Sequence, residues 1–86
     1  MASYSLEIKR SAAREIEALS TKKDRRLVVD RISRLADDPR PPGSEKLADD
    51  ARYRVRQGSY RIVYEIDDAA RVVCIIKVGH RREVYR

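Results

Sequence analysis

Three arginines on two neighbouring runs of the chain are the side chains best suited to chemistry: Arg54, Arg56 and Arg61. In both runs charged residues alternate with apolar or aromatic ones, and the pair Gly58-Ser59 separates the runs. Alternation with a period of two indicates strands with one buried face, and a leading glycine in a two-residue loop favours a type II′ hairpin. This hairpin places Arg56 directly opposite Arg61 and leaves Arg54 on the same face.

Two like charges that face each other destabilise a sheet unless an anion lies between them. The expected Arg56–Arg61 pair therefore predicts a phosphate-binding surface, since arginine grips phosphate through two parallel N–H bonds. The alternative is an ordinary solvated sheet face that happens to be rich in arginine. The opposite face of the hairpin is expected to join the core through Tyr53, Val55, Ile62 and Tyr64.

Three further candidates follow the last expected strand: His80, Arg81 and Tyr85. Histidine titrates near neutral pH, and a tyrosine can stack on a base or transfer a proton. Together with the arginines, these groups can bind a phosphate, stabilise a pentavalent phosphorane and move a proton. RNA supplies its own nucleophile in the 2′-hydroxyl, so such a set can cleave RNA without a metal.

The remaining composition excludes several other kinds of site. The chain has one histidine, one cysteine, no C-x-x-C pair and no glycine-rich phosphate loop, so we expect no metal and no cofactor. Cys74 lies in an apolar run and is expected to be a small buried side chain. The acidic pairs, such as Asp67-Asp68, lie beside turn signals and are expected to be solvated.

The net charge of +6 and the isoelectric point near 9.8 favour a polyanionic partner. The positive charge is concentrated in residues 51–86, which hold 9 basic and 4 acidic side chains, against 11 and 10 in residues 1–50. No apolar stretch approaches the length of a membrane span, and the N-terminus does not resemble a signal peptide. We therefore expect a cytoplasmic protein that has no membrane partner.

The first half of the chain predicts one strand and two helices. Residues 3–9 alternate like a strand, with Tyr4, Leu6 and Ile8 expected to be buried. Ser11 is expected to cap a helix over residues 12–19. The spacing Thr21-x-x-Asp24 resembles a capping box, which would open a second helix that runs to about Asp38. The expected buried stripes of the two helices are Ala12, Ala13, Ile16 and Leu19, then Leu27, Val28, Ile32 and Leu35.

The second half predicts a three-stranded unit. Pro41 and Pro42 end the second helix, and a loop is expected as far as Asp50. The arginine-bearing hairpin follows, and Arg71–Val78 is expected to be a central strand that Gly79 ends. The order β-α-α-β-β-β predicts one α+β domain over residues 1–86, with two helices on the apolar face of a small, mainly antiparallel sheet and an open arginine face.

The whole chain resembles the RelE toxins of bacterial type II toxin–antitoxin pairs, within the RelE/ParE superfamily. The strand motif of the hairpin is shared with ParE-type relatives, whereas the C-terminal motif favours RelE. The resemblance is carried by Tyr53-Arg54-Val55-Arg56, Gly58-Ser59-Tyr60-Arg61-Ile62-Val63-Tyr64, Val78-Gly79-His80-Arg81 and Glu83-Val84-Tyr85.

The resemblance implies a ribosome-dependent mRNA endoribonuclease that cuts the codon in the A site and inhibits translation. Attack by the 2′-hydroxyl would leave a 2′,3′-cyclic phosphate. It implies a RelB-like antitoxin, the ribosome and mRNA as partners, with operator DNA bound only through the antitoxin. Two alternatives stay open: a ParE-like toxin that poisons DNA gyrase without cutting, and an inactive relative that serves only as the antitoxin's partner.

The resemblance also assigns roles to the candidate residues. Arg54 and Arg56 fall at basic positions of the family that are often lysines. Arg61 and Arg81 fall on its phosphate-stabilising arginines, and Tyr85 falls on its C-terminal tyrosine. Arginine does not lose its proton in proteins, so the general base would be Tyr85 or His80.

Overall fold

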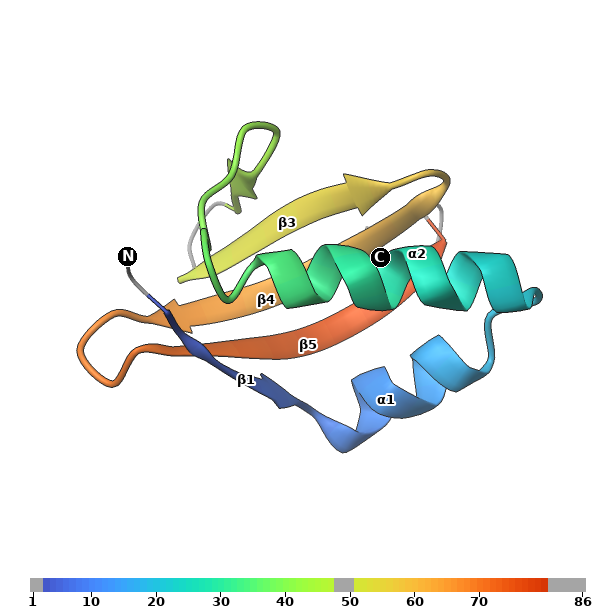
Figure 1. The fold of residues 1–86 in the computed structure, drawn as a ribbon, viewed down its shortest axis with the longest axis horizontal. Coiled ribbons are helices and arrows are strands. Elements are labelled where there is room, and N and C mark those ends of the chain that lie inside the picture. Colours follow the sequence, from blue (N-terminus) through green and yellow to red (C-terminus); the bar gives the residue numbers. More distant parts are fainter. Residues whose placement is uncertain (1–2, 48–50, 81–86) are drawn as a thin grey trace.

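The computed structural model describes residues 3–47 and 51–80. Five strands form one sheet in the order β1-β5-β4-β3-β2, and two helices lie on the same side of it (Figure 1). The β1–β5 pair is parallel and the other pairs are antiparallel, so the α+β architecture expected from the sequence is confirmed. The elements are β1 (Ser5–Ile8), α1 (Arg10–Glu17), α2 (Lys22–Arg34), β2 (Glu45–Lys46), β3 (Arg52–Gln57), β4 (Tyr60–Asp67) and β5 (Val72–His80).

The β3–β4 hairpin has the predicted register. Arg56 is paired with Arg61, and Arg54 with Val63. Gly58 has a φ of 60°, whereas Ser59 keeps a negative φ, and this combination identifies a type II′ turn. The hairpin therefore sends alternate residues to the helices and the rest to the opposite face of the sheet.

The core lies between the helices and the sheet. Tyr64 is its largest fully buried side chain, and its hydroxyl donates to the carbonyl of Pro39 at 2.6 Å. Burial raises the pKa of Tyr64 to about 12, because the phenolate would lose its water. The core side chains are Ala12, Ile16, Leu19, Val28, Ile32, Leu35, Val55, Ile62, Tyr64, Val73, Ile75 and Val78.

The start of α1 differs from the prediction. The helix begins at Arg10 with Lys9 as its N-cap, and no side chain caps it, so the expected cap at Ser11 is wrong. The backbone explains the difference. The Lys9 amide donates to the carbonyl of Ile75 in the sheet, while the Lys9 carbonyl accepts from Ala13 in the helix. The chain thus passes directly from strand to helix.

The predicted start of α2 at Thr21 is confirmed, because the Thr21 hydroxyl caps the helix by accepting from the amide of Asp24 at 3.0 Å. The helix ends at Arg34 and not near Asp38. Beyond it, the amides of Leu35, Ala36 and Asp37 bond three residues back, which tightens the last turn.

Two apolar residues expected in the core are exposed instead. Leu27 of α2 is 38% exposed, and Ile8 at the end of the edge strand β1 is 46% exposed. The stripe of α2 that packs on the sheet is therefore narrower than the sequence suggested, and it is formed by Val28, Ile32 and Leu35.

The predictions for two strands were also wrong. Strand β5 continues through Gly79 to His80, because Gly79 stays in the ladder opposite Arg61. Strand β2 was expected to be loop, but Glu45 and Lys46 pair with Arg54 and Tyr53 of β3. A strand of two residues leaves no alternation in the sequence by which to detect it.

Among the residues that the structure describes, the part of β5 after Ile75 has no strand partner on the side of β1, because the β1–β5 pairing ends at Ile8 and Ile75. Helix α1 covers this edge. The Glu15 carboxylate accepts from the amide of Val78 at 2.9 Å and from the Lys77 ammonium at 3.0 Å. No helix within the described ranges is both long and apolar enough to cross a membrane.

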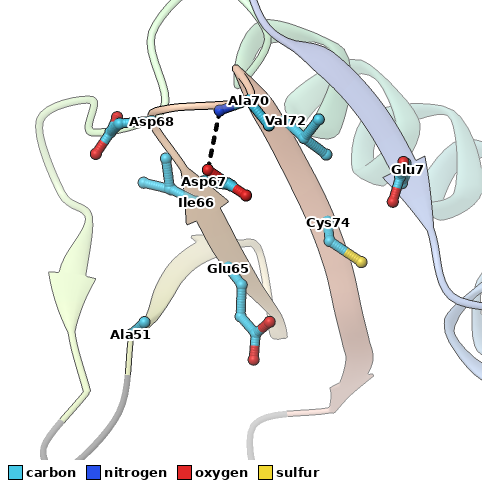
Figure 2. Close-up of a pocket in the computed structure, with 9 residues that line it drawn as sticks. All are labelled: Glu7, Ala51, Glu65, Ile66, Asp67, Asp68, Ala70, Val72 and Cys74. Atoms are coloured by element: carbon cyan, nitrogen blue, oxygen red, sulfur yellow. Dashed lines mark hydrogen bonds between the residues drawn. The ribbon is translucent and has the colours of Figure 1, made fainter.

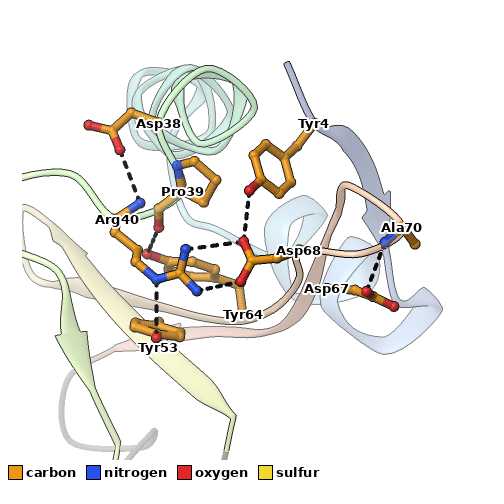
Figure 3. A network of polar contacts seen from close by, with 9 residues as sticks. All are labelled: Tyr4, Asp38, Pro39, Arg40, Tyr53, Tyr64, Asp67, Asp68 and Ala70. Carbon is orange, nitrogen blue, oxygen red and sulfur yellow. Dashed lines mark hydrogen bonds and ion pairs between the residues drawn. The ribbon is translucent and has the colours of Figure 1, made fainter. Parts of the chain in front are cut away.

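A polar network ties the loop after α2 to the β4–β5 turn (Figure 3). Arg40 donates to both carboxylate oxygens of Asp68, at 3.2 and 2.9 Å, and to the hydroxyl of Tyr53 at 3.2 Å. Its guanidinium also lies 5.2 Å from the centre of the Tyr53 ring. The hydroxyl of Tyr4 donates to Asp68 at 2.7 Å. The hydrogen bonds from Arg40, and then that from Tyr4, lower the pKa of Asp68 to about 2.

Candidate functional site

The hairpin brings the three predicted arginines together, on the side of the sheet opposite the core residues Val55 and Ile62. We call Arg54, Arg56 and Arg61 the arginine face. Its accessibility differs from the prediction of an open surface. Arg54 and Arg61 are each 6% exposed, and only Arg56 is classed as exposed. A phosphate therefore reaches Arg56 directly, whereas Arg54 and Arg61 lie below the surface.

The buried side chain of Arg54 has a counter-ion, Glu45, that was not predicted from the sequence. Strand β2 places Glu45 beside Arg54, and the two side chains form an ion pair. The Glu45 side chain is 58% exposed, whereas that of Arg54 is 8% exposed. The carboxylate thus occupies a position next to the guanidinium that a phosphate oxygen would otherwise take. Sequence reasoning missed Glu45 because β2 is too short to be recognised.

His80 does not share the arginine face. It is the last residue of β5 and pairs with Tyr60, whereas Arg61 pairs with Gly79. Successive rungs of a ladder point to opposite faces, so His80 and Arg61 lie on different sides of the sheet. The rings of Tyr60 and His80 meet edge to face, with centres 6.1 Å apart. The predicted site residues Arg81 and Tyr85 lie outside the described residues, and their placement stays a prediction.

The other end of the same sheet face is acidic (Figure 2). Glu7, Glu65 and Cys74 occupy one row of the sheet, and Arg52 completes this row. Glu7, Glu65 and Cys74 border a cavity of about 660 Å³ that Asp67 and Asp68 also line. Arg52 pairs with Glu65 at 3.0 Å and Arg40 pairs with Asp68 at 2.9 Å, so two of the four carboxylates are neutralised. The remaining negative charge disfavours phosphate here, which leaves the hairpin end as the more favourable place for an anion.

Cys74 lies at this acidic end. The pKa of its thiol is raised mainly by partial burial and, to a smaller extent, by the nearby carboxylates of Glu7 and Glu65. A raised pKa keeps the thiol protonated and poorly nucleophilic. Cys74 is half-buried and not fully buried as expected, because it lies on the sheet face opposite the helices. Within residues 3–47 and 51–80, no group of three His, Cys, Asp or Glu side chains is arranged to hold a metal ion.

Taken together, the described groups can bind and neutralise a phosphate at the hairpin end of the sheet. Arginine donates hydrogen bonds in a fixed fork and stays charged, so the arginine face can stabilise a dianionic phosphorane. It cannot accept a proton. A proton acceptor for a transfer reaction has to come from a side chain other than these three.

Comparison with known proteins gives a consistent assignment. Residues 6–85 match the family model described as the ParE toxin of the type II toxin–antitoxin system parDE. Toxin RelG of Mycobacterium tuberculosis is 44% identical over 34 residues, which are 40% of this chain and 39% of the length of that toxin.

Solved toxin structures share the fold. The RelE–RelB complex of Pyrococcus horikoshii OT3 superposes with a TM-score of 0.82 at 25% identity, covering 96% of this chain and 99% of that one. The toxin–antitoxin complex RelBE2 of M. tuberculosis gives 0.80 at 27% identity, with 92% and 99% covered. The isolated RelE toxin of E. coli gives 0.78 at 27% identity, with 95% and 90% covered.

The family model spans nearly all of the chain, and the sheet order and helix placement agree with the RelE structures. The resemblance inferred from the hairpin and C-terminal motifs is therefore confirmed. This chain belongs to the ParE toxin family of type II toxin–antitoxin systems, within the RelE/ParE superfamily.

Proposed function

We propose that this protein is a metal-independent endoribonuclease of the RelE type, which cuts mRNA in the ribosomal A site. One observation carries the proposal: the hairpin register sets Arg56 against Arg61 and keeps Arg54 on the same face. A protein gains no stability from opposing two arginines, so the arrangement favours a function in which an anion is held.

The proposed reaction uses the nucleophile that RNA carries. The 2′-oxygen attacks the adjacent phosphorus, the bond from phosphorus to the 5′-oxygen breaks, and a 2′,3′-cyclic phosphate and a 5′-hydroxyl result. A base takes the 2′-hydroxyl proton, and the 5′-oxygen receives a proton as it leaves. The arginine face stabilises the charge of the phosphorane. Because His80 lies on the other side of the sheet, we propose Tyr85 as the proton-transfer group and Arg81 as a further phosphate contact.

We further propose that the partner is a RelB-like antitoxin, through which operator DNA would be bound. The solved relatives from P. horikoshii and M. tuberculosis are toxin–antitoxin complexes, and their toxins share the fold of this chain. An antitoxin that covers the arginine face with acidic side chains would block RNA from it.

A second candidate function follows from the family model itself, which is that of ParE toxins. A ParE-like toxin would bind DNA gyrase and leave RNA intact. The two functions differ in the first damage seen after induction: cut mRNA for the RelE type, and broken DNA with intact mRNA for the ParE type.

The test is cleavage of ribosome-bound mRNA in a translation extract, mapped by primer extension. Arg56→Ala is the variant of choice, because Arg56 is exposed and its loss should leave the melting temperature nearly unchanged. We expect cleavage to fall at least tenfold, as for removal of one charge-stabilising contact. The exposed Arg26→Ala on α2 is the matched control and should cut normally. Intact mRNA with the unmodified chain would contradict the proposal.

Tyr85 is tested with two substitutions. If its hydroxyl transfers a proton, both Tyr85→Phe and Tyr85→Ala should lose cleavage. If the ring only stacks on a base, Tyr85→Phe should stay active while Tyr85→Ala fails, since stacking contributes about 1–3 kcal/mol per base. Full activity of Tyr85→Ala would remove this residue from the site.

A further inference from the structure

Two cavities meet at the end of the sheet that carries the hairpin turn, and Tyr60 and His80 line both of them. The first, of about 420 Å³, reaches Glu15 and the corner between α1 and α2. The second, of about 340 Å³, reaches Asp24 at the start of α2 and the turn itself. Both volumes fall within the range of about 300–1,000 Å³ that is usual for sites of small organic groups.

The two aromatic rings form a corner. Their planes are 83° apart and their centres are 6.1 Å apart. The Tyr60 hydroxyl donates to the Asp24 carboxylate at 3.2 Å, which fixes the orientation of the ring. A third flat ring can stack on one member of such a pair while its edge meets the other, an arrangement that aromatic groups favour. The shape therefore suits a planar heterocycle.

The polar groups around this corner select the chemistry of that heterocycle. Asp24 and Glu15 bring carboxylates, and Gln57 and Ser59 bring an amide and a hydroxyl. An ionised carboxylate accepts hydrogen bonds, offers no donor, and repels phosphate. A ligand group that fits is neutral and carries N–H donors, as do the amino groups of adenine, cytosine and guanine. Uracil has no amino group and offers only its ring N3–H, which lies between two carbonyl oxygens that an ionised carboxylate repels.

The corner lies one rung away from the arginine face. Arg56 and Arg61 are paired on one side of the sheet, and Gln57 and Tyr60 form the next pair on the other side. Only the turn at Gly58 and Ser59 lies beyond them at this end of the hairpin. A strand of RNA whose phosphate lies on Arg56 can therefore direct a base around the turn, because proteins commonly bind single-stranded RNA with its bases splayed apart.

We propose that the corner formed by Tyr60, His80 and Asp24 is a nucleobase site that prefers bases with an amino group. The ring stacks on the aromatic pair and the amino group donates to the Asp24 carboxylate. The inference rests on the proposed function, since it takes the arginine face as the track for the phosphates. It gives His80 a role in base stacking and none in proton transfer.

The test measures the affinity of the full chain for labelled oligo(A), oligo(C) and oligo(U) by fluorescence anisotropy, without ribosomes. We expect oligo(A) and oligo(C) to bind about fivefold or more tightly than oligo(U), the ratio that one base-specific contact provides. Asp24→Asn replaces an acceptor with a group that also donates, so this preference should fall to about one. Asp30→Asn, on the same helix but paired with Arg34, is the matched control and should keep it.

His80→Ala removes one ring of the corner, and we expect all three affinities to fall about fivefold or more. Melting temperatures of each variant separate this effect from a loss of folding. Equal binding of the three oligonucleotides by the unmodified chain, no binding of any of them, or an unchanged preference in Asp24→Asn overturns the inference. Base-selective binding without mRNA cleavage would keep the nucleobase site and reject the nuclease. Cleavage of mRNA without base-selective binding would keep the nuclease and reject the nucleobase site.

Discussion

Glu45 is the residue that most directly controls access to Arg54. Its carboxylate is half exposed and pairs with a guanidinium that is almost fully buried. The pair neutralises a buried charge, and it also competes with any phosphate that approaches Arg54. A single acidic side chain can therefore lower the affinity of the arginine face for a phosphate anion.

We expect Glu45→Gln to raise the affinity for single-stranded RNA by up to about fivefold, because a half-exposed ion pair contributes about 0.2–1 kcal/mol. The measurement is a binding titration at fixed salt, since affinities for nucleic acid depend on salt concentration. Glu17→Gln on α1, which is also exposed, is the control for the loss of one negative charge. A lower affinity in Glu45→Gln would show that Glu45 holds Arg54 in place for RNA.

Tyr64 links the core to the loop that follows α2. Its buried hydroxyl donates to the carbonyl of Pro39 at 2.6 Å. Tyr64→Phe would leave that carbonyl without this donor, so we expect the free energy of unfolding to fall by about 1–3 kcal/mol. Urea denaturation measures the change. An unchanged midpoint would mean that another donor replaces the hydroxyl.

At the scale of the elements, the contacts of Asp68 fasten three segments: β1 through Tyr4, the loop after α2 through Arg40, and the β4–β5 turn. The folded pKa of Asp68 is depressed to about 2 from an ordinary value of 3.8. A depressed pKa means that the carboxylate form stabilises the fold. Its contribution is fully present above pH of about 4 and is lost as the pH falls towards about 2.

We therefore expect Asp68→Asn to be less stable than the unmodified chain at neutral pH, with the difference shrinking between about pH 4 and about pH 2. Thermal unfolding across this pH range provides the measurement. Asp30→Asn is again the control, because Asp30 and its partner Arg34 form an exposed ion pair within one helix. A difference that stays constant down to about pH 2 would contradict the assignment of the low pKa to Asp68.

The elements that the sequence predicted are those with strong local signals. The Gly58-Ser59 turn sets the register of β3 and β4, and the Thr21 cap begins α2. The errors come from tertiary contacts. Ile8, at the end of the edge strand β1, is left exposed. Gly79 is held in the ladder opposite Arg61, and β2 forms only because β3 lies beside it. No local pattern reports such contacts.

At the scale of the whole molecule, charge is separated along one face of the sheet. The arginine face lies at the hairpin end, whereas Glu7, Glu65 and Asp67 line the cavity at the other end. The sequence predicted the shared face of the arginines from period and turn type alone. It did not predict their burial, which for Arg54 involves the short strand β2, nor that His80 belongs to the opposite side, because β5 continues through Gly79 to His80.

The parallel pairing of β1 with β5 constrains when the fold can be completed during synthesis. Ser5 pairs with Val72, and Tyr4 bonds to Asp68 across 64 positions of the chain. Strand β1 thus waits for β5, the last described strand, before the backbone bonds between the two strands can form. A nascent chain arrested before β5 has left the exit tunnel should be digested by protease, and one extended well beyond it should resist. For a toxin that would act on ribosomes, this topology delays its own activity until β5 has been synthesised.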